Sequence, residues 1–308
     1  MCTRNGYDLD SLIMRGPYLH LLLRHRTFQI VPDPLPVQCA ALLFPLLLWF
    51  AMFFLVARLV PPSPQRIDTY VLPSVEQMLF GDLRVRVAEA HHPILDTIAA
   101  LGYVAHYVAP WLFLVYLCTR VSIGAACKFA WTIGIVTSVC TATHLIFPTA
   151  PPWFVDPTNV HVPSATADPS IGEQNAAALA RVDHLTGYPV FASIYGSSTV
   201  KFGAFPSIHA AWPLLMTVHD PGLWPLFGWA YTALVWWAAV YLHHHWVLDV
   251  VCSSLYVLFG IVFGPILYTL LSAQFPIIFG AATTPQRKSR RLPLFFRYDD
   301  DGGGVELV

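Results

Sequence analysis

Charge is what this sequence most obviously lacks. Only 11% of its 308 residues are Asp, Glu, Lys or Arg, against roughly 25% in a typical soluble domain. No run of Lys or Arg is long enough to suggest a nucleic-acid surface. Because 56% of the residues are hydrophobic, a water-soluble globular domain is also disfavoured. We therefore expect membrane lipid, and not nucleic acid, as the partner of this chain.

Closely spaced cysteine pairs are absent as well. The six cysteines are scattered along the chain, and none forms the short-spaced pair that is typical of a zinc site. Most fall within or beside apolar stretches, where buried free thiols are expected. The cysteines therefore predict no zinc site, and we expect no metal or other cofactor in the chemistry.

A cleavable secretory signal is not apparent in the first 36 residues, whose only apolar core candidate is the short run at 21–23. Such a run is too brief for the apolar region of a signal peptide. We expect residues 1–37 to form a cytosolic N-terminal segment. Membrane insertion would then begin at the first true span.

Long apolar runs are what the sequence does contain. Residues 38–60 are enough to cross a hydrocarbon layer of ~30 Å as a helix that rises ~1.5 Å per residue. We predict an all-α, polytopic membrane domain over residues 38–272 and a cytosolic, largely disordered tail over 273–308. The domain would hold about six transmembrane helices, at 38–60, 94–119, 125–147, 207–219, 223–243 and 247–272. The fourth is much shorter than the others.

The distribution of Arg and Lys predicts which loops lie on each side of the membrane. Both ends of the chain are basic, and positive residues favour the cytosolic side, so an even number of spans is required. The loops at 61–93 and 148–206 and the connection between spans five and six would then lie on the opposite side. Arginines in the first of these loops are exceptions to the rule. With this topology His209 and His245 emerge on the same face of the membrane.

Three histidines and a carboxylate are predicted at the start of the last apolar helix. His245 and Asp249 stand four residues apart, so on a helix they share one face. A carboxylate there can accept the proton of one ring nitrogen and leave the other as a nucleophile. Two alternatives remain: histidines bonded to headgroups or water at a membrane interface, and a metal site. The metal is less favoured, because consecutive helical residues point ~100° apart.

A second group of candidate residues begins the short fourth span. Pro206 suits a first helical turn, and Gly203 permits an unusual backbone turn just before it. The Ser207 hydroxyl and the N–H groups of the helix start would face a phosphate favourably. His209 could then donate a proton to a leaving oxygen. The alternative is a set of capping residues beside an ordinary histidine.

These residues carry a family resemblance. Pro-Ser-Ile-His at 206–209 and His-x-x-x-Asp at 245–249 resemble the second and third signature motifs of the type-2 phosphatidate phosphatase superfamily. Its members are six-helix membrane enzymes that work through a phosphohistidine. More specifically, the chain is similar to the inositol phosphorylceramide synthases of fungi over about residues 70–270. The similar blocks are 72–81, 147–153, 180–187, 202–209 and 241–245.

The resemblance implies a function that the residues alone do not specify. A synthase of this kind transfers phosphoinositol from phosphatidylinositol to ceramide in sphingolipid biosynthesis and releases diacylglycerol. His209, His245 and Asp249 would be its catalytic residues. A Golgi location, a lumenal active site and a small regulatory membrane subunit are further expectations from the family.

The chain also departs from the broader superfamily. None of its three lysines begins the usual Lys-x6-Arg-Pro motif, and Ala239 stands where the phosphatases carry an Arg. These differences argue against a simple lipid phosphate phosphatase, which remains the main alternative together with a phosphotransferase for another acceptor. A non-catalytic scaffold or transporter is the third. Arg181 and Lys201 are the nearest candidate cations for the phosphate, although both can be solvated loop charges. Trp153 is either an aromatic anchor or a substrate contact.

Overall fold

The computed structural model describes residues 29–30, 35–59, 66–155, 177–196, 200, 202–222, 225–274, 282–283, 297–298 and 305–306. The chain divides into two units, Met1–Gln29 with Ala282–Val308, and Ile30–Ala281. The first includes the antiparallel pair β3 (Arg297–Tyr298) and β4 (Val305–Glu306), with Arg297 opposite Glu306. Two further short strands are β1 (Gln29–Ile30) and β2 (Ala282–Thr283). The predicted N-terminal segment and tail lie largely outside the described residues.

The second unit is a helical bundle, and each apolar run predicted to span the membrane is helical over nearly all of its described part. The first run is α3 (Leu35–Ala51), which continues through the π-helical turn η1 (Met52–Val56) into α4 (Ala57–Leu59). The second is α7 (Pro93–Tyr116), which ends in the π-helical turn η3 (Leu117–Val121). The other four are α8 (Ile123–Ile146), α12 (Ile208–His219), α13 (Pro225–Tyr241) and α14 (Val247–Gln274).

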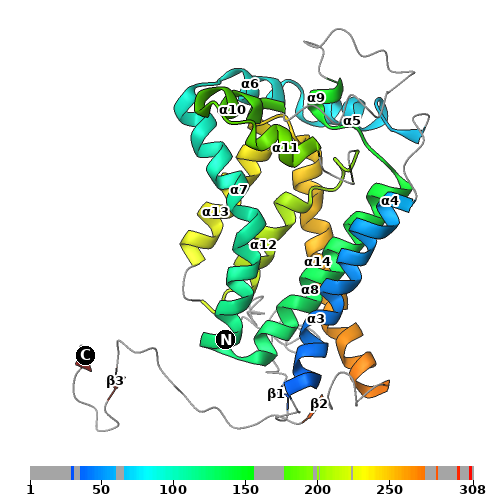
Figure 1. Cartoon of the computed structure of the whole chain (residues 1–308), viewed down its shortest axis with the longest axis vertical. Helices are drawn as coiled ribbons and strands as arrows, with labels where there is room; N and C mark the ends of the chain where they lie inside the picture. The colour runs from blue at the N-terminus through cyan, green and yellow to red at the C-terminus, as the bar shows by residue number, and fades with distance from the viewer. Residues whose placement is uncertain are drawn as a thin grey trace, which may run out of the picture. The chain divides into compact units, whose positions relative to one another are not determined.

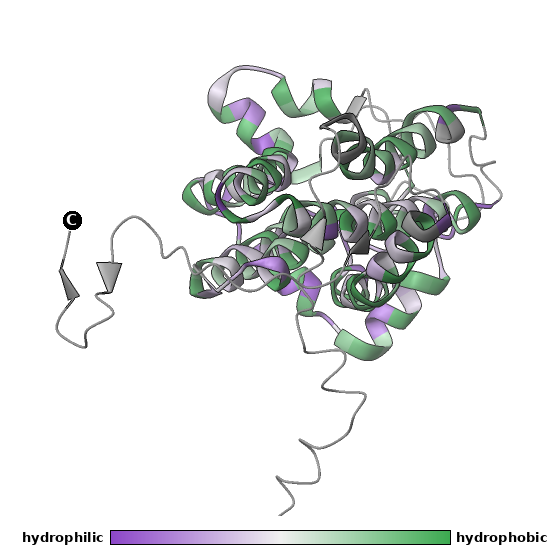
Figure 2. Ribbon diagram, turned by 90° about the horizontal axis from the view of Figure 1, so that it is seen from below, coloured by the Kyte–Doolittle hydropathy of each residue, from purple (hydrophilic) through white to green (hydrophobic). Residues whose placement is uncertain are grey.

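The composition of these helices fits a membrane environment. Among the described residues, Pro93–Val121, Ile123–Ile146 and Val247–Leu271 are long and apolar enough to cross a bilayer, and Cys39–Leu55 is a shorter apolar helix. Many large apolar side chains on these helices are exposed, such as Leu47, Leu112 and Leu255. Figure 2 shows the hydrophobic colouring that results along the helices of the bundle. The count of six spans stays a prediction.

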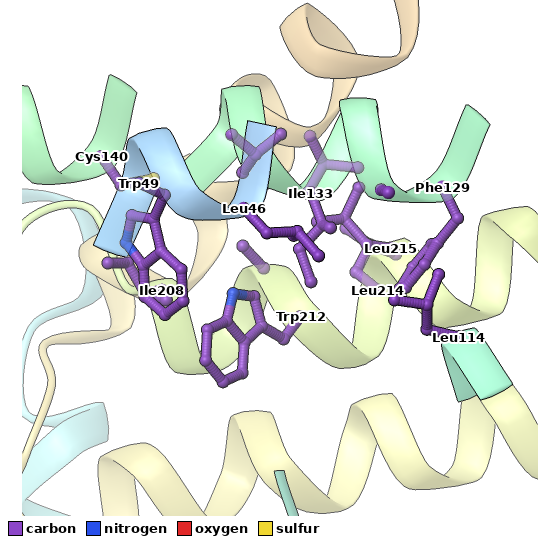
Figure 3. Close-up of a cluster of buried hydrophobic side chains, with 14 of the residues drawn as sticks. Leu46, Trp49, Leu114, Phe129, Ile133, Cys140, Ile208, Trp212, Leu214 and Leu215 are labelled. Atoms are coloured by element: carbon purple, nitrogen blue, oxygen red, sulfur yellow. The ribbon is translucent and has the colours of Figure 1, made fainter. Parts of the chain in front are cut away.

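The short helix α12 is at the centre of the bundle. It packs against α7, α8, α13 and α14, while α3 packs against α8. Figure 3 shows part of the core that results, in which Trp212 of α12 lies beside Trp49 of α3 with ring centroids 5.6 Å apart. Because neighbouring helices surround α12, most of its side chains are buried by protein. This central position holds His209 inside the bundle.

The two segments predicted as outer loops contain short helices of their own. Figure 1 shows them at the end of the bundle where α12 begins and where α13 connects to α14. They are α5 (Val71–Phe80), α6 (Leu83–Glu89), α9 (Pro152–Val155), η5 (Ala177–Leu179), α10 (Ala180–Thr186) and α11 (Val190–Gly196). This end of the bundle is therefore covered by protein.

Three distant segments run side by side at this end. Thr149 forms parallel bridges with Asp68 on one side and Gly203 on the other. Its backbone N–H donates to Phe202 O at 2.8 Å, and its hydroxyl accepts from the N–H of Phe205 at 2.8 Å. Because Thr149 is fully buried, these bonds are shielded from water. They fix the chain that leads into α12.

Candidate active site

Ser207 defines where α12 begins. It is the N-cap residue, and its hydroxyl accepts a hydrogen bond of 3.1 Å from the N–H of Ala210. Pro206 therefore lies before the helix, and the prediction that it occupies the first turn is wrong, because the serine takes the capping position. The N–H of Ser207 donates to the backbone oxygen of Asp249 at 3.3 Å. This bond ties the start of α12 to the start of α14.

Gly203 is explained by a close contact and not by an unusual turn. Its φ is not positive, so the prediction of a special backbone conformation is wrong. A Cβ at this position would lie 2.8 Å from Nδ1 of His144. The same imidazole, which sequence reasoning missed, contacts Pro206 O through Nε2 at 2.9 Å. The glycine lets the chain pass directly over the His144 ring.

The triple histidine lies in a turn and not on a helix. Helix α13 ends at Tyr241 and α14 begins at Val247. The N–H groups of His244 and His245 both bond to Ala239 O at 3.1 Å, which closes the turn. The prediction of three imidazoles at the head of the last helix is thus wrong by about one turn. The i, i+4 contact with Asp249 still forms, because His245 directly precedes the first residues of α14.

His245 is buried, and its Nδ1 faces two oxygens. Ala204 O lies 3.0 Å away and Asp249 Oδ2 lies 3.4 Å away. A carbonyl oxygen can only accept, so Nδ1 carries the proton and Nε2 keeps its lone pair. Burial lowers the pKa of His245, which favours the neutral ring. The arrangement supplies an unprotonated nitrogen at neutral pH.

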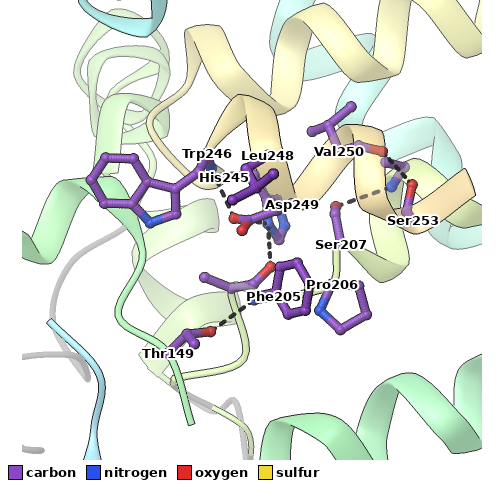
Figure 4. Close-up of polar contacts among 12 residues, drawn as sticks. Thr149, Phe205, Pro206, Ser207, His245, Trp246, Leu248, Asp249, Val250 and Ser253 are labelled. Carbon is purple, nitrogen blue, oxygen red and sulfur yellow. Dashed lines mark hydrogen bonds and ion pairs between the residues drawn. The ribbon is translucent and has the colours of Figure 1, made fainter. Parts of the chain in front are cut away.

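Asp249 is fully buried and holds two groups at once. Its Oδ2 accepts the N–H of Trp246 at 2.8 Å and faces His245 Nδ1. Trp246 directly precedes α14, and Asp249 is the third residue of that helix. A carboxylate at the third position that accepts the N–H of the residue before the helix forms half of a capping box. Figure 4 shows Asp249 and His245 beside Phe205 and Ser207. The predicted carboxylate is therefore in place behind His245, although the carbonyl of Ala204 is the closer acceptor.

The structure brings His209 and His245 together from separate segments. Their ring centroids lie 5.3 Å apart, with the ring planes 62° from parallel. His209 is partly exposed, whereas His245 is 4% exposed. Sequence reasoning missed two further residues beside them. Tyr103 stacks on His244 with ring centroids 5.3 Å apart, and His106 contacts the His209 ring.

Glu76 and Arg84 are two more residues of this region that sequence reasoning missed. Glu76 of α5 is buried and accepts hydrogen bonds from the N–H groups of Val247 at 3.0 Å and Leu248 at 2.9 Å. Burial raises the pKa of Glu76, while these bonds and the charge of Arg84 oppose the rise. Arg84 lies 5.0 Å over the Trp246 ring. The only signal for Glu76 was a single acidic residue inside the block at 72–81.

The predicted substrate-binding residues lie in different surroundings. Arg181 donates two hydrogen bonds to Oδ1 of Asp96, at 3.0 and 2.7 Å. Trp153 is 8% exposed and packs in a small apolar cluster, and its backbone N–H donates to His243 O at 3.2 Å. Lys201 lies outside the described residues. Within the described ranges, no group of three or more His, Cys, Asp or Glu could hold a metal ion.

Comparisons with known proteins place the chain in a family. Residues 71–263 match the PAP2 superfamily. The chain is 30% identical to the inositol phosphorylceramide synthase catalytic subunit aur1 of Schizosaccharomyces pombe, over 67% of this chain and 48% of that protein. It is also 30% identical to the catalytic subunit AUR1 of Saccharomyces cerevisiae, over 70% of this chain and 54% of that protein.

The chain covers a larger share of a bacterial relative than of the fungal ones. The chain is 30% identical to the phosphoinositol dihydroceramide synthase of Bacteroides thetaiotaomicron, over 64% of this chain and 67% of that protein. The chain thus spans about half the length of the fungal relatives. No solved structure matches it. The matched residues include both histidine motifs, the whole of α7, α8, α12 and α13 and the first part of α14, and the chain belongs to the PAP2 superfamily.

Proposed function

We propose that this chain is an inositol phosphorylceramide synthase, which transfers phosphoinositol from phosphatidylinositol to ceramide and releases diacylglycerol. The observation that carries the proposal is the approach of His209 and His245 to 5.3 Å between ring centroids, with Asp249 behind His245. The names of the fungal and bacterial relatives support the same donor group and a ceramide-type acceptor.

In the first step, Nε2 of His245 attacks the phosphorus of phosphatidylinositol. The bond from phosphorus to the diacylglycerol oxygen breaks, and His209 as general acid protonates that oxygen. The phosphoinositol group is then bonded to His245. Asp249 stabilises the positive charge that the ring acquires, because its buried carboxylate faces Nδ1.

In the second step, the primary hydroxyl of ceramide attacks the same phosphorus. His209, now neutral, takes the hydroxyl proton while the bond to His245 breaks. Inositol phosphorylceramide leaves, and both histidines return to their starting states. No net proton is gained or lost over the two steps. The burial of His245 limits the access of water, which favours transfer to a lipid over hydrolysis.

The phosphate charge must be compensated during both steps. Ser207 caps α12 with its oxygen, which leaves the hydroxyl hydrogen to donate to a phosphate oxygen. Arg181 is held by Asp96 and would act from the edge of the site. Lys201 stays the second candidate cation from the sequence. Trp153 would contact the substrate only through a small movement, because its ring is buried.

The location and partners belong to the same proposal. The enzyme would be a multi-pass protein of the Golgi membrane whose active site faces the lumen, where the short helices α5, α6 and α9 to α11 cover the site. A small regulatory membrane subunit would accompany it. Metal and cofactor have no part in the two steps.

A transfer assay with purified protein in lipid nanodiscs tests the proposal. Labelled phosphatidylinositol is supplied with ceramide, dihydroceramide, diacylglycerol or no acceptor, and products are separated by chromatography. We expect transfer to the ceramides and its loss in His245→Ala, with a labelled phosphohistidine trapped in the wild type without acceptor. Full activity in His245→Ala would refute the mechanism.

The same assay separates the alternatives. Release of inorganic phosphate from phosphatidate, with no dependence on inositol lipid, would identify a lipid phosphate phosphatase. Transfer only to an acceptor other than a ceramide would identify a related phosphotransferase. No turnover of any lipid by folded protein would favour a scaffold or transporter. His184→Ala is a matched control, because His184 is an exposed histidine of α10 in the same covering region.

A further inference from the structure

A fully buried histidine lies directly behind His209. His106 of α7 has no exposed surface, and its Nε2 lies 2.5 Å from Nδ1 of His209. Its other ring nitrogen, Nδ1, contacts the backbone oxygen of Tyr103. The two imidazoles come from helices that are far apart in sequence, so the contact depends on how α7 packs against α12.

The backbone oxygen fixes where the protons lie in this pair. A carbonyl can only accept, so Nδ1 of His106 carries the hydrogen of its neutral ring. Nε2 of His106 is then an acceptor, and Nδ1 of His209 must be the donor to it. Neutral His209 consequently keeps its lone pair on Nε2. Nε2 is left as the ring nitrogen that is available to the substrate.

We propose that His106 is a positioning residue that makes His209 a competent acid and base. This inference rests on the proposed function and adds a residue to it. With His106 in place, His209 takes up and gives back a proton at Nε2 only, and the Nδ1–H stays bonded in both states. Without it, a buried N–H loses its partner, and His209 can rotate or change tautomer.

The arrangement parallels the one around His245. There the oxygen of Ala204 holds Nδ1–H and leaves Nε2 as the nucleophile. At His209 the Tyr103 oxygen also fixes the proton on Nδ1, but it acts through the His106 imidazole that lies between them. An imidazole can polarise along the bond when His209 becomes charged, because both of its nitrogens are engaged. Positioning partners of a ligating or catalytic histidine commonly act in this way.

Replacement of the leaving group distinguishes positioning from simple packing. In the donor lipid the departing alkoxide needs a proton, but a thiolate of pKa about 8.5 does not. We therefore compare phosphatidylinositol with an analogue whose bridging oxygen to glycerol is sulfur. The variants are His106→Leu, His106→Gln and His209→Ala, each purified as the full chain in nanodiscs. Single-turnover release of diacylglycerol or of the thiol is measured.

We expect His106→Leu to slow release of diacylglycerol by about 10²-fold or more, the range of general acid catalysis. Release of the thiol should stay within about threefold of the wild type. His209→Ala should show the same selectivity, and His106→Gln should restore part of the rate because its side-chain oxygen can accept from Nδ1–H of His209.

Two results would overturn the inference without touching the proposed function. One is an equal loss with both leaving groups in His106→Leu, which indicates packing alone. The other is an unchanged rate with both. Failure of the proposed function itself has a different signature: the wild type would release neither leaving group, or His245→Ala would still release both.

Discussion

The carboxylate of Glu76 accepts a hydrogen bond of 2.9 Å from the backbone N–H of Leu248, 172 residues later in the chain. Its second oxygen accepts the N–H of Val247. A negative charge at a helix N-terminus is favourable, and the first N–H groups of a helix lack partners within it. Helix α5, which lies outside the predicted spans, therefore holds the helix that carries Asp249.

Replacement of Glu76 should loosen the start of α14. Glu76→Ala leaves two partly buried N–H groups without an acceptor, and each lost bond costs at most about 1–3 kcal/mol. We expect a lower thermal unfolding temperature together with reduced lipid transfer. Glu76→Gln keeps one acceptor oxygen and should lose less. Thermal unfolding in nanodiscs and the transfer assay measure the two effects, and equal stability of the Ala variant and the wild type would contradict the capping role.

The stability difference between the wild type and Glu76→Gln should depend on pH. Burial raises the pKa of Glu76 above its ordinary value of 4.5, so the folded protein binds this proton more tightly than the unfolded chain. The wild type then loses stability relative to the Gln variant as pH rises from 4.5 to the raised value. The unfolding temperatures of both proteins, recorded across that pH range, measure this loss. A wild type that gains stability relative to the Gln variant as pH rises would contradict the raised pKa.

Asp249→Asn separates the charge of Asp249 from its capping bond. The amide oxygen can still accept the N–H of Trp246, but the negative charge behind His245 is gone. We expect lipid transfer to fall by about 10²- to 10⁴-fold, as when the carboxylate of a catalytic triad is neutralised. The unfolding temperature should change little. An Asn variant with near-normal transfer rates would exclude a role for the charge.

Gly203→Ala should damage the site through a steric conflict. The added Cβ would lie 2.8 Å from both Nδ1 of His144 and Cγ1 of Val200, and forced contacts of this kind cost about 1–3 kcal/mol. Because residues 204–207 follow directly, we expect transfer to fall more than stability alone explains.

Gly264→Ala is the matched control for that variant. Its Cβ would meet Thr132 at 3.2 Å, but it lies about 22 Å along α14 from Asp249. We expect a change in unfolding temperature with little specific loss of activity. If the two glycine variants show the same ratio of activity to stability, the close passage over His144 has no special importance for the site.

Arg181 can be tested with and without its partner Asp96. Arg181→Ala leaves a nearly buried carboxylate unpaired, and we expect a loss of about 1–3 kcal/mol, between the values for exposed and buried ion pairs. The double variant Arg181→Ala, Asp96→Asn should recover most of this stability. If Arg181 also binds phosphate, KM for phosphatidylinositol stays raised in the double variant. Full recovery of KM would assign Arg181 to structure only.

The spacing of residues in the sequence predicted those features of the fold and site that depend on residues close together in the chain. The apolar runs located the helices to within a few residues, and the i, i+4 spacing placed Asp249 beside His245. The even number of predicted spans puts His209 and His245 on the same face of the membrane, which agrees with the contact between their rings. Each of these follows from helix geometry or from the membrane.

The residues that were missed depend on packing between distant segments. Glu76 reaches α14, Arg84 reaches the turn after α13, and His106 reaches α12. No periodicity in one segment indicates which partner it meets. The errors at Pro206 and at the triple histidine have a related cause, because both extended a helix backwards beyond the start of its apolar run. Capping by Ser207 and the tight turn at 242–246 keep those residues out of the helices.

The acceptor that fixes the proton on His245 belongs to the main chain, at Ala204. Every amino acid has the same backbone carbonyl, so no substitution at position 204 removes this acceptor. A systematic mutational scan would detect only the effect of side-chain volume at that position. A group essential to the chemistry would thus pass through such a scan unnoticed. Variation among natural sequences at this position would be equally uninformative about it.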